Sequence, residues 1–372
     1  MTVVVRRHVL FLIPSLFAGG SERVLLTLLR HIDRDAFRLT LAVVDLRNAA
    51  FLHELAGDVE LVDLKSTRVR YALPKIIRLI WKQRPQVVFS TLGHLNLALA
   101  VIRPLLPGAT RFVARESCFV SELIRHDVLP QVWRWAYRRF YRRFDVVVCQ
   151  STAMRDDLVE NYLLPVAQTV VVDNPVDVAY LRRMAALPVA TGFEKAKAQQ
   201  GTDPIHLLAV GRLVEQKGFD ILIEALARCQ NPCFRLTLIG EGVLRDELEA
   251  QARRQGVAAQ LRFVGLQRNP YPFFAQADVY VLSSRFEGFP NTVLEALACG
   301  TPVIATPALG GIRDFLRGVE GCEVADSVSS EALATAICRW ATRAERRLKV
   351  PAAIVQHELH RVVPQYEAIL RA

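Results

Sequence analysis

Residues 206–229 read HLLAVGRLVEQKGFDILIEALARC, and this stretch decides the fold. It begins with a short apolar run typical of a buried strand and continues through a loop bounded by glycines. It ends in a segment whose apolar residues recur at helical spacing. Because strands joined through helices in this way run in the same direction, the stretch predicts a parallel sheet with helices on both faces.

The same alternation runs through both halves of the chain. In the first half the expected strands are HVLFLIP, RLTLAVVDL, QVVFS, RFVARE, DVVVCQ and TVVVDNPVD. In the second half they are HLLAVG, FRLTLIG, LRFVG, VYVLSS and PVIAT. Since 372 residues exceed the usual size of one hydrophobic core, we expect two Rossmann-like, doubly wound α/β domains. We place the first at residues 1–175 and the second at 176–355, with a polar stretch near residues 189–204, and a last helix at 356–372.

Composition narrows the class of protein. The seven cysteines are odd in number and contain no C-x-x-C pair, so neither a disulfide framework nor a zinc site is indicated, and buried thiols in a reducing compartment are expected. The apolar run near the start leads into a glycine loop rather than a cleavage site, and no run reaches the 18 or so apolar residues of a membrane span. We therefore expect a cytoplasmic protein.

The net charge of +10 is unequally shared. Residues 1–175 carry 24 Lys and Arg against 16 Asp and Glu, whereas residues 176–372 carry 23 against 21. The positive charge of the first half therefore indicates an anionic partner, which is a membrane surface, an acidic acceptor or nucleic acid.

Ligands of doubly wound sheets bind beyond the carboxyl ends of strands, so three loops that follow strands are informative. In the first, Gly19 and Gly20 precede a helical pattern, and the backbone there can approach an anion closely. The alternative is a plain turn with Ser21 as a helix cap. In the second, Arg212 and Lys217 lie five positions apart and can converge on a diphosphate, unless both are solvated loop charges.

The third loop, residues 287–295, reads EGFPNTVLE. Glu287 lies in the loop, and Glu295 lies about one turn into the helix that follows. This offset lets one carboxylate meet a sugar and the other a ribose, with the amides of the helix N-terminus facing a diphosphate between them. Alternatively, the two acids share no ligand.

These segments, with LIGEGVLRDEL, the run from Phe263 to Thr306 and GGIRDFL, together resemble the donor domain of glycosyltransferase family 4, retaining enzymes of the GT-B fold. The resemblance implies two domains facing across a cleft, with the last helix crossing back to the first. It assigns the diphosphate to Arg212 and Lys217, with the Gly19-Gly20 loop opposite, the ribose to Glu295 and the sugar to Glu287. The other implied donor contacts are Glu241, Leu266, Gly288, Phe289, Pro290, Asn291 and Thr292. It implies no metal and no cofactor beyond a nucleotide-sugar co-substrate.

One position departs from the family's pattern. Many members place a histidine after a strand of the acceptor domain, whereas the corresponding loop here reads Ala114-Arg115-Glu116-Ser117. His94, after the preceding expected strand, and Glu116 are the candidates for a catalytic part. The alternative for His94 is a helix N-terminal histidine without one. Retaining transfer can proceed with the donor phosphate accepting the acceptor's proton, so the departure does not argue against activity.

The segment from Val128 to Phe144 is basic and aromatic. At helical spacing its aromatic residues Trp133, Tyr137, Phe140 and Phe144 share one face. Such a helix suits an anionic headgroup layer, so we expect peripheral contact with the inner face of the plasma membrane. The residues predicted to contact membrane or acceptor are Trp133, Arg134, Tyr137, Arg138, Phe140 and Arg142. A core helix and RNA binding are the alternatives, but no RNA-binding module is recognisable, and we expect no nucleic-acid partner.

The sequence therefore predicts a retaining glycosyltransferase that moves a hexosyl or N-acetylhexosaminyl group from a UDP-sugar to a glycan or lipid-linked glycan in cell-surface polysaccharide biosynthesis. An epimerase of similar fold and a non-catalytic donor-binding partner are the alternatives.

Overall fold

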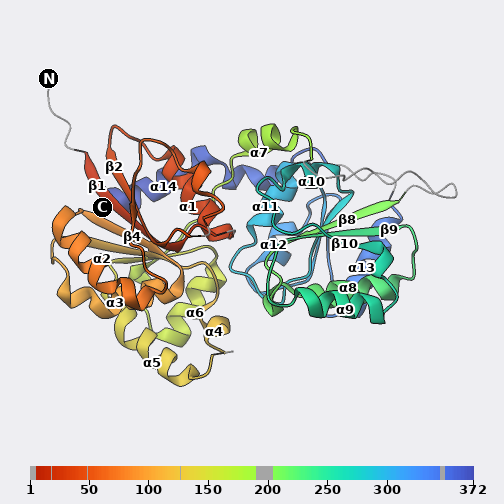
Figure 1. Cartoon of the computed structure of the whole chain (residues 1–372), viewed down its shortest axis with the longest axis horizontal. Helices are drawn as coiled ribbons and strands as arrows, with labels where there is room; N and C mark the ends of the chain where they lie inside the picture. The colour runs from red at the N-terminus through yellow and green to blue at the C-terminus, as the bar shows by residue number, and fades with distance from the viewer. Residues whose placement is uncertain (1–5, 18, 48, 126, 190–203, 344–347) are drawn as a thin grey trace. The chain divides into compact units, whose positions relative to one another are not determined.

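The computed structural model describes residues 6–17, 19–47, 49–125, 127–189, 204–343 and 348–372. They form two compact units (Figure 1). The first unit comprises the chain up to Pro175 together with Leu359–Ala372, and the second comprises Val176–Glu358. The chain therefore passes from one unit to the other twice. The polar stretch expected near residues 189–204 lies almost wholly outside the described residues.

The first unit is built on a seven-stranded parallel sheet with the order β3-β2-β1-β4-β5-β6-β7. Its strands are β1 (Arg7–Ser15), β2 (Phe37–Asp45), β3 (Glu60–Asp63), β4 (Val87–Thr91), β5 (Arg111–Arg115), β6 (Val146–Cys149) and β7 (Thr169–Val171). The strand order reverses between β1 and β4. Loops that follow these two strands therefore lie at the point where doubly wound sheets bind ligands.

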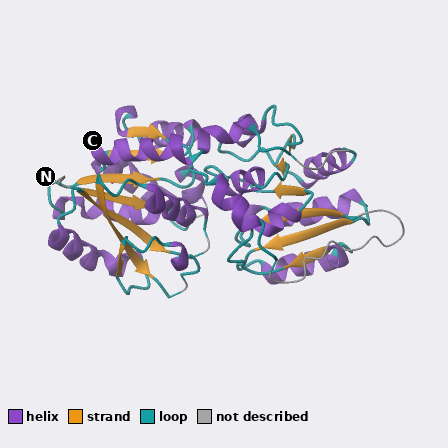
Figure 2. Ribbon diagram, turned by 90° about the horizontal axis from the view of Figure 1, so that it is seen from above, coloured by secondary structure: helices purple, strands orange, loops and turns teal. Residues whose placement is uncertain are grey.

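Helices cover both faces of this sheet (Figure 2). They are α1 (Gly20–His31), α2 (Val69–Gln83), α3 (Gly93–Ile102), α4 (Val120–Arg125), α5 (Pro130–Phe140), α6 (Thr152–Tyr162) and α14 (Leu359–Arg371). Alternate residues of β1 point to opposite faces. Leu10 and Leu12 pack in the core formed with α2, α3 and α6, whereas Phe11 and Ile13 pack in the core formed with α1 and α14.

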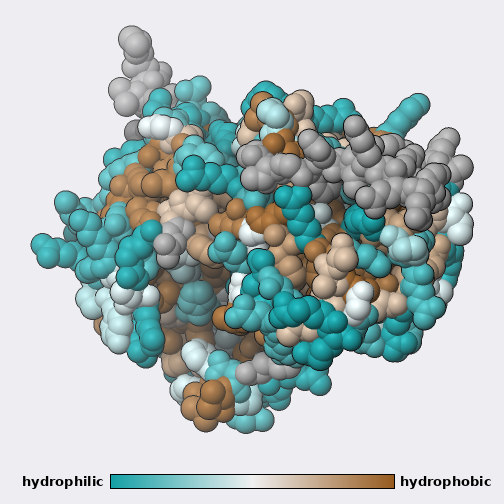
Figure 3. Space-filling model, turned by 45° about the vertical axis from the view of Figure 1, so that its right-hand side comes forward, coloured by the Kyte–Doolittle hydropathy of each residue, from teal (hydrophilic) through white to brown (hydrophobic). Residues whose placement is uncertain are grey.

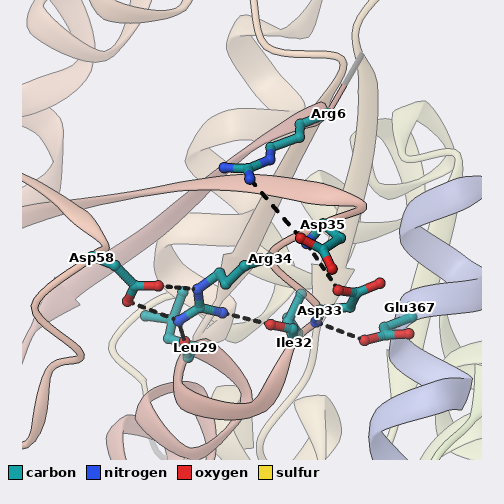
Figure 4. Close-up of polar contacts among 8 residues, drawn as sticks. All are labelled: Arg6, Leu29, Ile32, Asp33, Arg34, Asp35, Asp58 and Glu367. Atoms are coloured by element: carbon teal, nitrogen blue, oxygen red, sulfur yellow. Dashed lines mark hydrogen bonds and ion pairs between the residues drawn. The ribbon is translucent and has the colours of Figure 1, made fainter. Parts of the chain in front are cut away.

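The C-terminal helix α14 is fixed to the first unit by both apolar and polar contacts. Its Tyr366 is buried in the same core as α1. Beyond the end of α1, the backbone N–H of Asp33 donates to Glu367 at 2.8 Å (Figure 4). The neighbouring Arg34 binds the carboxylate of Asp58 with bonds of 2.6 and 3.1 Å. The last helix therefore completes the first unit.

The second unit repeats the plan with a six-stranded parallel sheet in the order β10-β9-β8-β11-β12-β13. Its strands are β8 (Ile205–Val210), β9 (Phe234–Ile239), β10 (Leu261–Phe263), β11 (Val279–Leu282), β12 (Val303–Ala305) and β13 (Glu323–Val324). Its helices are α7 (Val178–Ala185), α8 (Phe219–Cys229), α9 (Arg245–Arg254), α10 (Tyr271–Gln276), α11 (Asn291–Ala298), α12 (Ile312–Leu316) and α13 (Ser330–Ala341).

Two cores again lie on opposite faces of the sheet. One contains α8, α9 and α13, and the other contains α7, α10, α11 and α12. The strand order reverses between β8 and β11. The prediction of two doubly wound, Rossmann-like domains is confirmed.

Candidate active site

The loops that follow β8 and β11 meet at the point where the second sheet reverses its order. The loop after β8 carries Arg212 and Lys217, and the loop after β11 carries Glu287. Several hydrogen bonds join the two loops: Ser283 Oγ donates to the carbonyl of Lys217 at 2.8 Å, and the N–H of Arg285 donates to the carbonyl of Gln216 at 2.8 Å. Residues about 70 positions apart are therefore held as one structure.

An ion pair between Lys217 and Glu287 lies at the centre of this structure. Lys217 Nζ is 2.5 Å from Glu287 Oε1, and the two side chains are only 18% and 8% exposed. The hydroxyl of Ser284 donates to the same carboxylate oxygen at 2.6 Å. Two residues that the sequence assigned to different parts of one ligand are thus in direct contact.

Two glycines let neighbouring loops approach each other closely, Gly218 between the loops after β8 and β11 and Gly240 between the loops after β9 and β8. Gly218 has a φ of +61°, and a Cβ built on it would lie 2.1 Å from the carbonyl oxygen of Ser283. Gly240 has a φ of +139°, and a Cβ there would lie 1.9 Å from the carbonyl oxygen of Gly211. Neither position tolerates a side chain without backbone movement.

Helix α11 starts directly after the EGFP segment. Its first-turn residue Thr292 accepts a hydrogen bond from the buried hydroxyl of Tyr280 at 2.7 Å, and burial raises the pKa of this phenol far above its usual range. Glu295 lies on the same helix and is buried. Behind the loop, Phe289 packs against Phe315 and His357 with ring centroids 5.2 and 5.1 Å apart. These contacts fix both the start of α11 and the segment before it.

Three other predicted donor residues lie in loops that follow strands of the same sheet. Arg212 and Glu241 are exposed, and Leu266 is half-buried. The carbonyl of Glu241 accepts from the N–H of Leu213 at 2.9 Å, so the loop after β9 is tied to the loop after β8. Gly288 and Pro290 belong to the segment that leads into α11, and Asn291 is the first residue of that helix. The sequence analysis gave no role to Ser283 and Ser284, which it placed at the end of the expected strand VYVLSS; the observed strand β11 ends at Leu282, so both serines lie in the loop.

In the first unit, the loops after β1 and β4 occupy the corresponding position. Gly19 precedes α1 and Gly20 begins it. A Cβ on Gly19 would lie 2.1 Å from a carboxylate oxygen of Glu22, so this acid covers the turn. After β4, His94 lies in the first turn of α3, its side chain is exposed, and partial desolvation lowers the pKa of its imidazole. The structure does not bring His94 and Glu116 together at one surface.

Glu116, the other candidate for a catalytic part, is completely buried and so presents no surface to a substrate. Its Oε1 accepts from Nδ2 of Asn96 at 2.9 Å and from the hydroxyl of Tyr141. Desolvation raises the pKa of Glu116 to about 8, against the opposing effects of the Asn96 hydrogen bond and the charge of Arg115. The carboxyl group belongs to the interior of the unit.

Helix α5 corrects the expected aromatic face. The helix ends at Phe140 and a 3₁₀ turn follows, so Phe144 is not on it. Tyr137 is buried in the core with Phe144 and cannot contact a membrane, and Phe140 is half-buried. The side of α5 that bears Tyr137 faces the core because the rings of Tyr137 and Tyr141 pack together, with their centroids 4.6 Å apart.

The exposed surface of α5 and the residues before it are instead apolar and basic. Val128 is 92% exposed and Trp135 is 60% exposed. The other exposed large apolar residues here are Leu129, Val132 and Trp133, and the exposed basic residues include Arg134, Arg138, Arg139 and Arg142. Apolar side chains also reach the surface low in Figure 3, the level at which Figure 1 draws α5.

The described ranges contain neither a cluster of metal-ligating side chains nor a membrane-spanning helix. No group of three His, Cys, Asp or Glu side chains there is arranged to hold a metal ion. None of the helices there combines the length and the apolar character that crossing a bilayer requires.

Comparison with known proteins identifies the family. Residues 18–180 match the model of Glycosyltransferase Family 4, and residues 204–343 match the model of Glycosyl transferases group 1. The chain belongs to glycosyltransferase family 4. The family resemblance noted in the sequence is therefore confirmed.

Curated relatives are 27% and 32% identical to the chain over the residues that align with it. An N-acetylgalactosaminyltransferase of Campylobacter jejuni, which acts on a diacetylbacillosaminyl-diphospho-undecaprenol glycan, is 27% identical over 82% of this chain and 81% of its own length. The lipopolysaccharide core glycosyltransferase LpsE of Rhizobium meliloti is 32% identical over 53% of this chain. The chain aligns with 54% of the length of LpsE and, in a separate comparison, with 60% of the length of an uncharacterized glycosyltransferase of Methanocaldococcus jannaschii.

Among solved structures, Anabaena HepE in complex with UDP has a TM-score of 0.75 and 20% identity, and the match covers 98% of this chain and 99% of HepE. This likeness is one of fold. It agrees with the GT-B architecture of family 4.

Proposed function

We propose that this family 4 protein transfers a hexosyl or N-acetylhexosaminyl group from a UDP-sugar to a glycan or lipid-linked glycan, with retention of anomeric configuration. The observation that carries the proposal is the Lys217–Glu287 ion pair at the switch point of the second sheet. It places a cation and a sugar-binding carboxylate side by side, where a nucleotide diphosphate sugar needs both.

Different residues of the second unit bind different parts of the donor. Lys217 and Arg212 bind the diphosphate and stabilise the charge that develops on the leaving group. Glu287 binds sugar hydroxyls, and Glu295 binds the ribose. Glu241 and Leu266 flank the nucleoside. The amides at the start of α11 face the phosphates.

The reaction needs no separate nucleophile or metal in this proposal. The bond between the anomeric carbon and the donor phosphate breaks, and the acceptor oxygen forms its new bond on the same face of the sugar. The departing phosphate oxygen takes the acceptor's proton. Lys217 and Arg212 supply the positive charge that a metal ion supplies in other transferases.

The acceptor side is assigned to the first unit. The exposed apolar and basic surface of α5 suits an anionic headgroup layer, since the apolar side chains enter the interface while arginines contact lipid phosphates. The Campylobacter relative is named for a polyprenyl-linked acceptor and LpsE for lipopolysaccharide core synthesis, which supports a lipid-linked acceptor at the inner face of the plasma membrane. The product would then be a cell-surface glycan.

The test is thermal unfolding of the full chain with UDP-glucose, UDP-galactose, UDP-N-acetylglucosamine and UDP-N-acetylgalactosamine, each in the presence of a chelator. One donor should raise the melting temperature, and Lys217→Met should abolish the shift, whereas Lys82→Met on the exposed face of α2 should not. Transfer is then measured with a polyprenyl diphosphate glycan in vesicles. Sugar isomerisation without acceptor would replace the proposal with an epimerase. Binding without any turnover would replace it with a non-catalytic partner.

A further inference from the structure

Glu116 is the first residue after β5, and the first unit encloses its side chain. Its backbone is held on both sides, since its N–H donates to the carbonyl of Val148 at 2.9 Å and its carbonyl accepts from Gln150 Nε2 at 3.0 Å. The residue is 0% exposed. A carboxyl group in this position is shut off from water, so its protonation depends on the groups packed against it.

The two carboxyl oxygens of Glu116 have unequal surroundings. Oε1 accepts two hydrogen bonds, from Asn96 and from Tyr141. Oε2 has no hydrogen-bond partner among the described residues. It faces Gly93, where a Cβ would lie 3.3 Å from Oε2 and 2.5 Å from the hydroxyl of Tyr137. Burial without a donor to Oε2 leaves a negative charge there unstabilised, so it favours the neutral acid, with the proton on Oε2, against the two donors to Oε1.

The charged and titratable groups around Glu116 do not supply a compensating cation. They are Arg115 on β5, Tyr137 on α5, Tyr141 after α5, Cys149 on β6 and Asp157 on α6. Arg115 instead donates to Asn174 Oδ1 at 2.6 Å and to the hydroxyl of Tyr366 at 3.2 Å. Asp157 adds a like charge. Burial raises the pKa of Cys149 to about 12 and that of Tyr137 well above its usual value, so both stay neutral near pH 7.

Through Asn96, the buried acid is joined to the first turn of α3. Asn96 also accepts from Ser90 Oγ at 2.7 Å and donates to the carbonyl of Arg115 at 3.1 Å. The turn begins at Leu92, whose φ of +77° is one that L side chains rarely adopt, so the surrounding contacts must hold it. His94 is the exposed residue of this turn.

We propose that Glu116 is a positioning residue that works as a neutral acid, holding the first turn of α3 and with it His94 in the geometry that transfer requires. Loss of its proton leaves a buried carboxylate with one bare oxygen, which draws in water or a neighbouring donor and displaces Asn96 and Gly93. Transfer therefore falls as pH rises through the pKa of Glu116, which burial sets at about 8. The inference rests on the proposed function, because it places the acceptor side of the reaction at this turn.

The experiment measures kcat/KM for the acceptor from pH 6 to pH 9.5, at saturating UDP-sugar, in the full chain. Wild type should show an alkaline limb with a midpoint near 8, and Glu116→Gln, which keeps a neutral group of the same shape, should retain turnover at pH 7 and lose this limb. Glu160→Gln, an exposed acid on α6 of the same unit, should keep the wild-type profile. An alkaline limb that is absent in wild type or unchanged in Glu116→Gln overturns the proposal.

A second variant keeps the test independent of how Glu116→Gln folds. Tyr141→Phe removes a donor to Oε1, and since that donor favours the carboxylate, the midpoint should move to higher pH. A midpoint that stays in place or moves lower overturns the proposal. UDP-induced thermal shifts measured on the same samples distinguish failure of the proposed function from failure of the role proposed for Glu116. If wild type neither binds UDP nor transfers sugar, the proposed function fails. If the donor binds normally and the pH profiles are unaltered, only the role of Glu116 is refuted.

Discussion

Replacing Glu287, the acid of the Lys217–Glu287 ion pair, should lower the stability of the nucleotide-free protein and strengthen nucleotide binding. Glu287→Gln leaves the Lys217 cation, 18% exposed, without the carboxylate that lies 2.5 Å away. Removing one partner of a buried pair costs about 3–5 kcal/mol, and the partial exposure of Lys217 lowers this to about 2–3 kcal/mol. For a domain of this size the loss corresponds to a fall in melting temperature of about 5–10 °C.

Binding of UDP should reverse part of this loss. If the diphosphate takes Lys217 from Glu287, wild type gives up the ion pair on binding, whereas Glu287→Gln has none to give up. The UDP-induced rise in melting temperature should therefore be larger in the variant than in wild type, while sugar transfer is lost because the sugar contact is missing. Glu215→Gln, an exposed acid in the same loop as Lys217, is the matched control and should behave as wild type.

Thermal unfolding with and without saturating UDP, followed by a transfer assay, measures both effects. A variant as stable as wild type would show that the pair contributes nothing to the empty protein. A smaller UDP shift in the variant would show that Glu287 orients Lys217 for the phosphates rather than competing with them.

Three further predictions address the backbone, the buried acid and the surface. Gly240→Ala should destabilise the second unit by at least about 2 kcal/mol in urea unfolding, because its Cβ would lie 1.9 Å from the carbonyl oxygen of Gly211; a loss below about 0.5 kcal/mol would contradict the close approach. The pKa of Glu116 is raised from 4.5 to about 8, so the native state holds this proton more tightly than the unfolded chain. Wild type should therefore lose up to about 5 kcal/mol of stability relative to Glu116→Gln as pH rises from 4.5 to 8, and a difference that does not vary with pH would refute the assignment. Replacing Val128 and Trp135 together by serine should abolish sedimentation with anionic vesicles without changing UDP binding, and unchanged sedimentation would exclude this surface.

The sheets and the donor loops could be predicted from the sequence because both depend on local pattern. Strongly apolar runs such as HLLAVG and FRLTLIG became β8 and β9, and the loops that follow strands carried the charged residues. Strand β3, with Glu60 and Asp63 at its ends, was missed, since it lacks a continuous apolar run. It pairs only with β2 at the edge of its sheet, where burial on both faces is not required.

The aromatic helix shows why helical spacing alone cannot choose a buried face. Trp133 and Tyr137 are four positions apart and would lie on the same side of an ideal helix, yet Trp133 is exposed and Tyr137 is buried. The packing of the Tyr137 ring against the tilted rings of Tyr141 and Tyr162 turns the buried side of the helix away from Trp133. That choice depends on residues of the following turn and of α6, which no periodicity within the helix can reveal.

Glu116 is enclosed without a cation, whereas Glu287 is paired with Lys217, and the direction in which neighbouring side chains point explains this difference. Both acids follow strands of parallel sheets, and Glu116 even has Arg115 directly before it in the sequence. Consecutive residues of an extended chain point to opposite faces of the sheet, so Arg115 reaches Tyr366 of α14 on one face while Glu116 reaches α3 on the other. Glu287 lies in a loop whose path returns its carboxylate to Lys217, 70 positions away. An arginine next to an acid in the sequence therefore does not show that the two pair at the end of a strand, since Glu116, directly after Arg115, is the acid whose pKa burial raises.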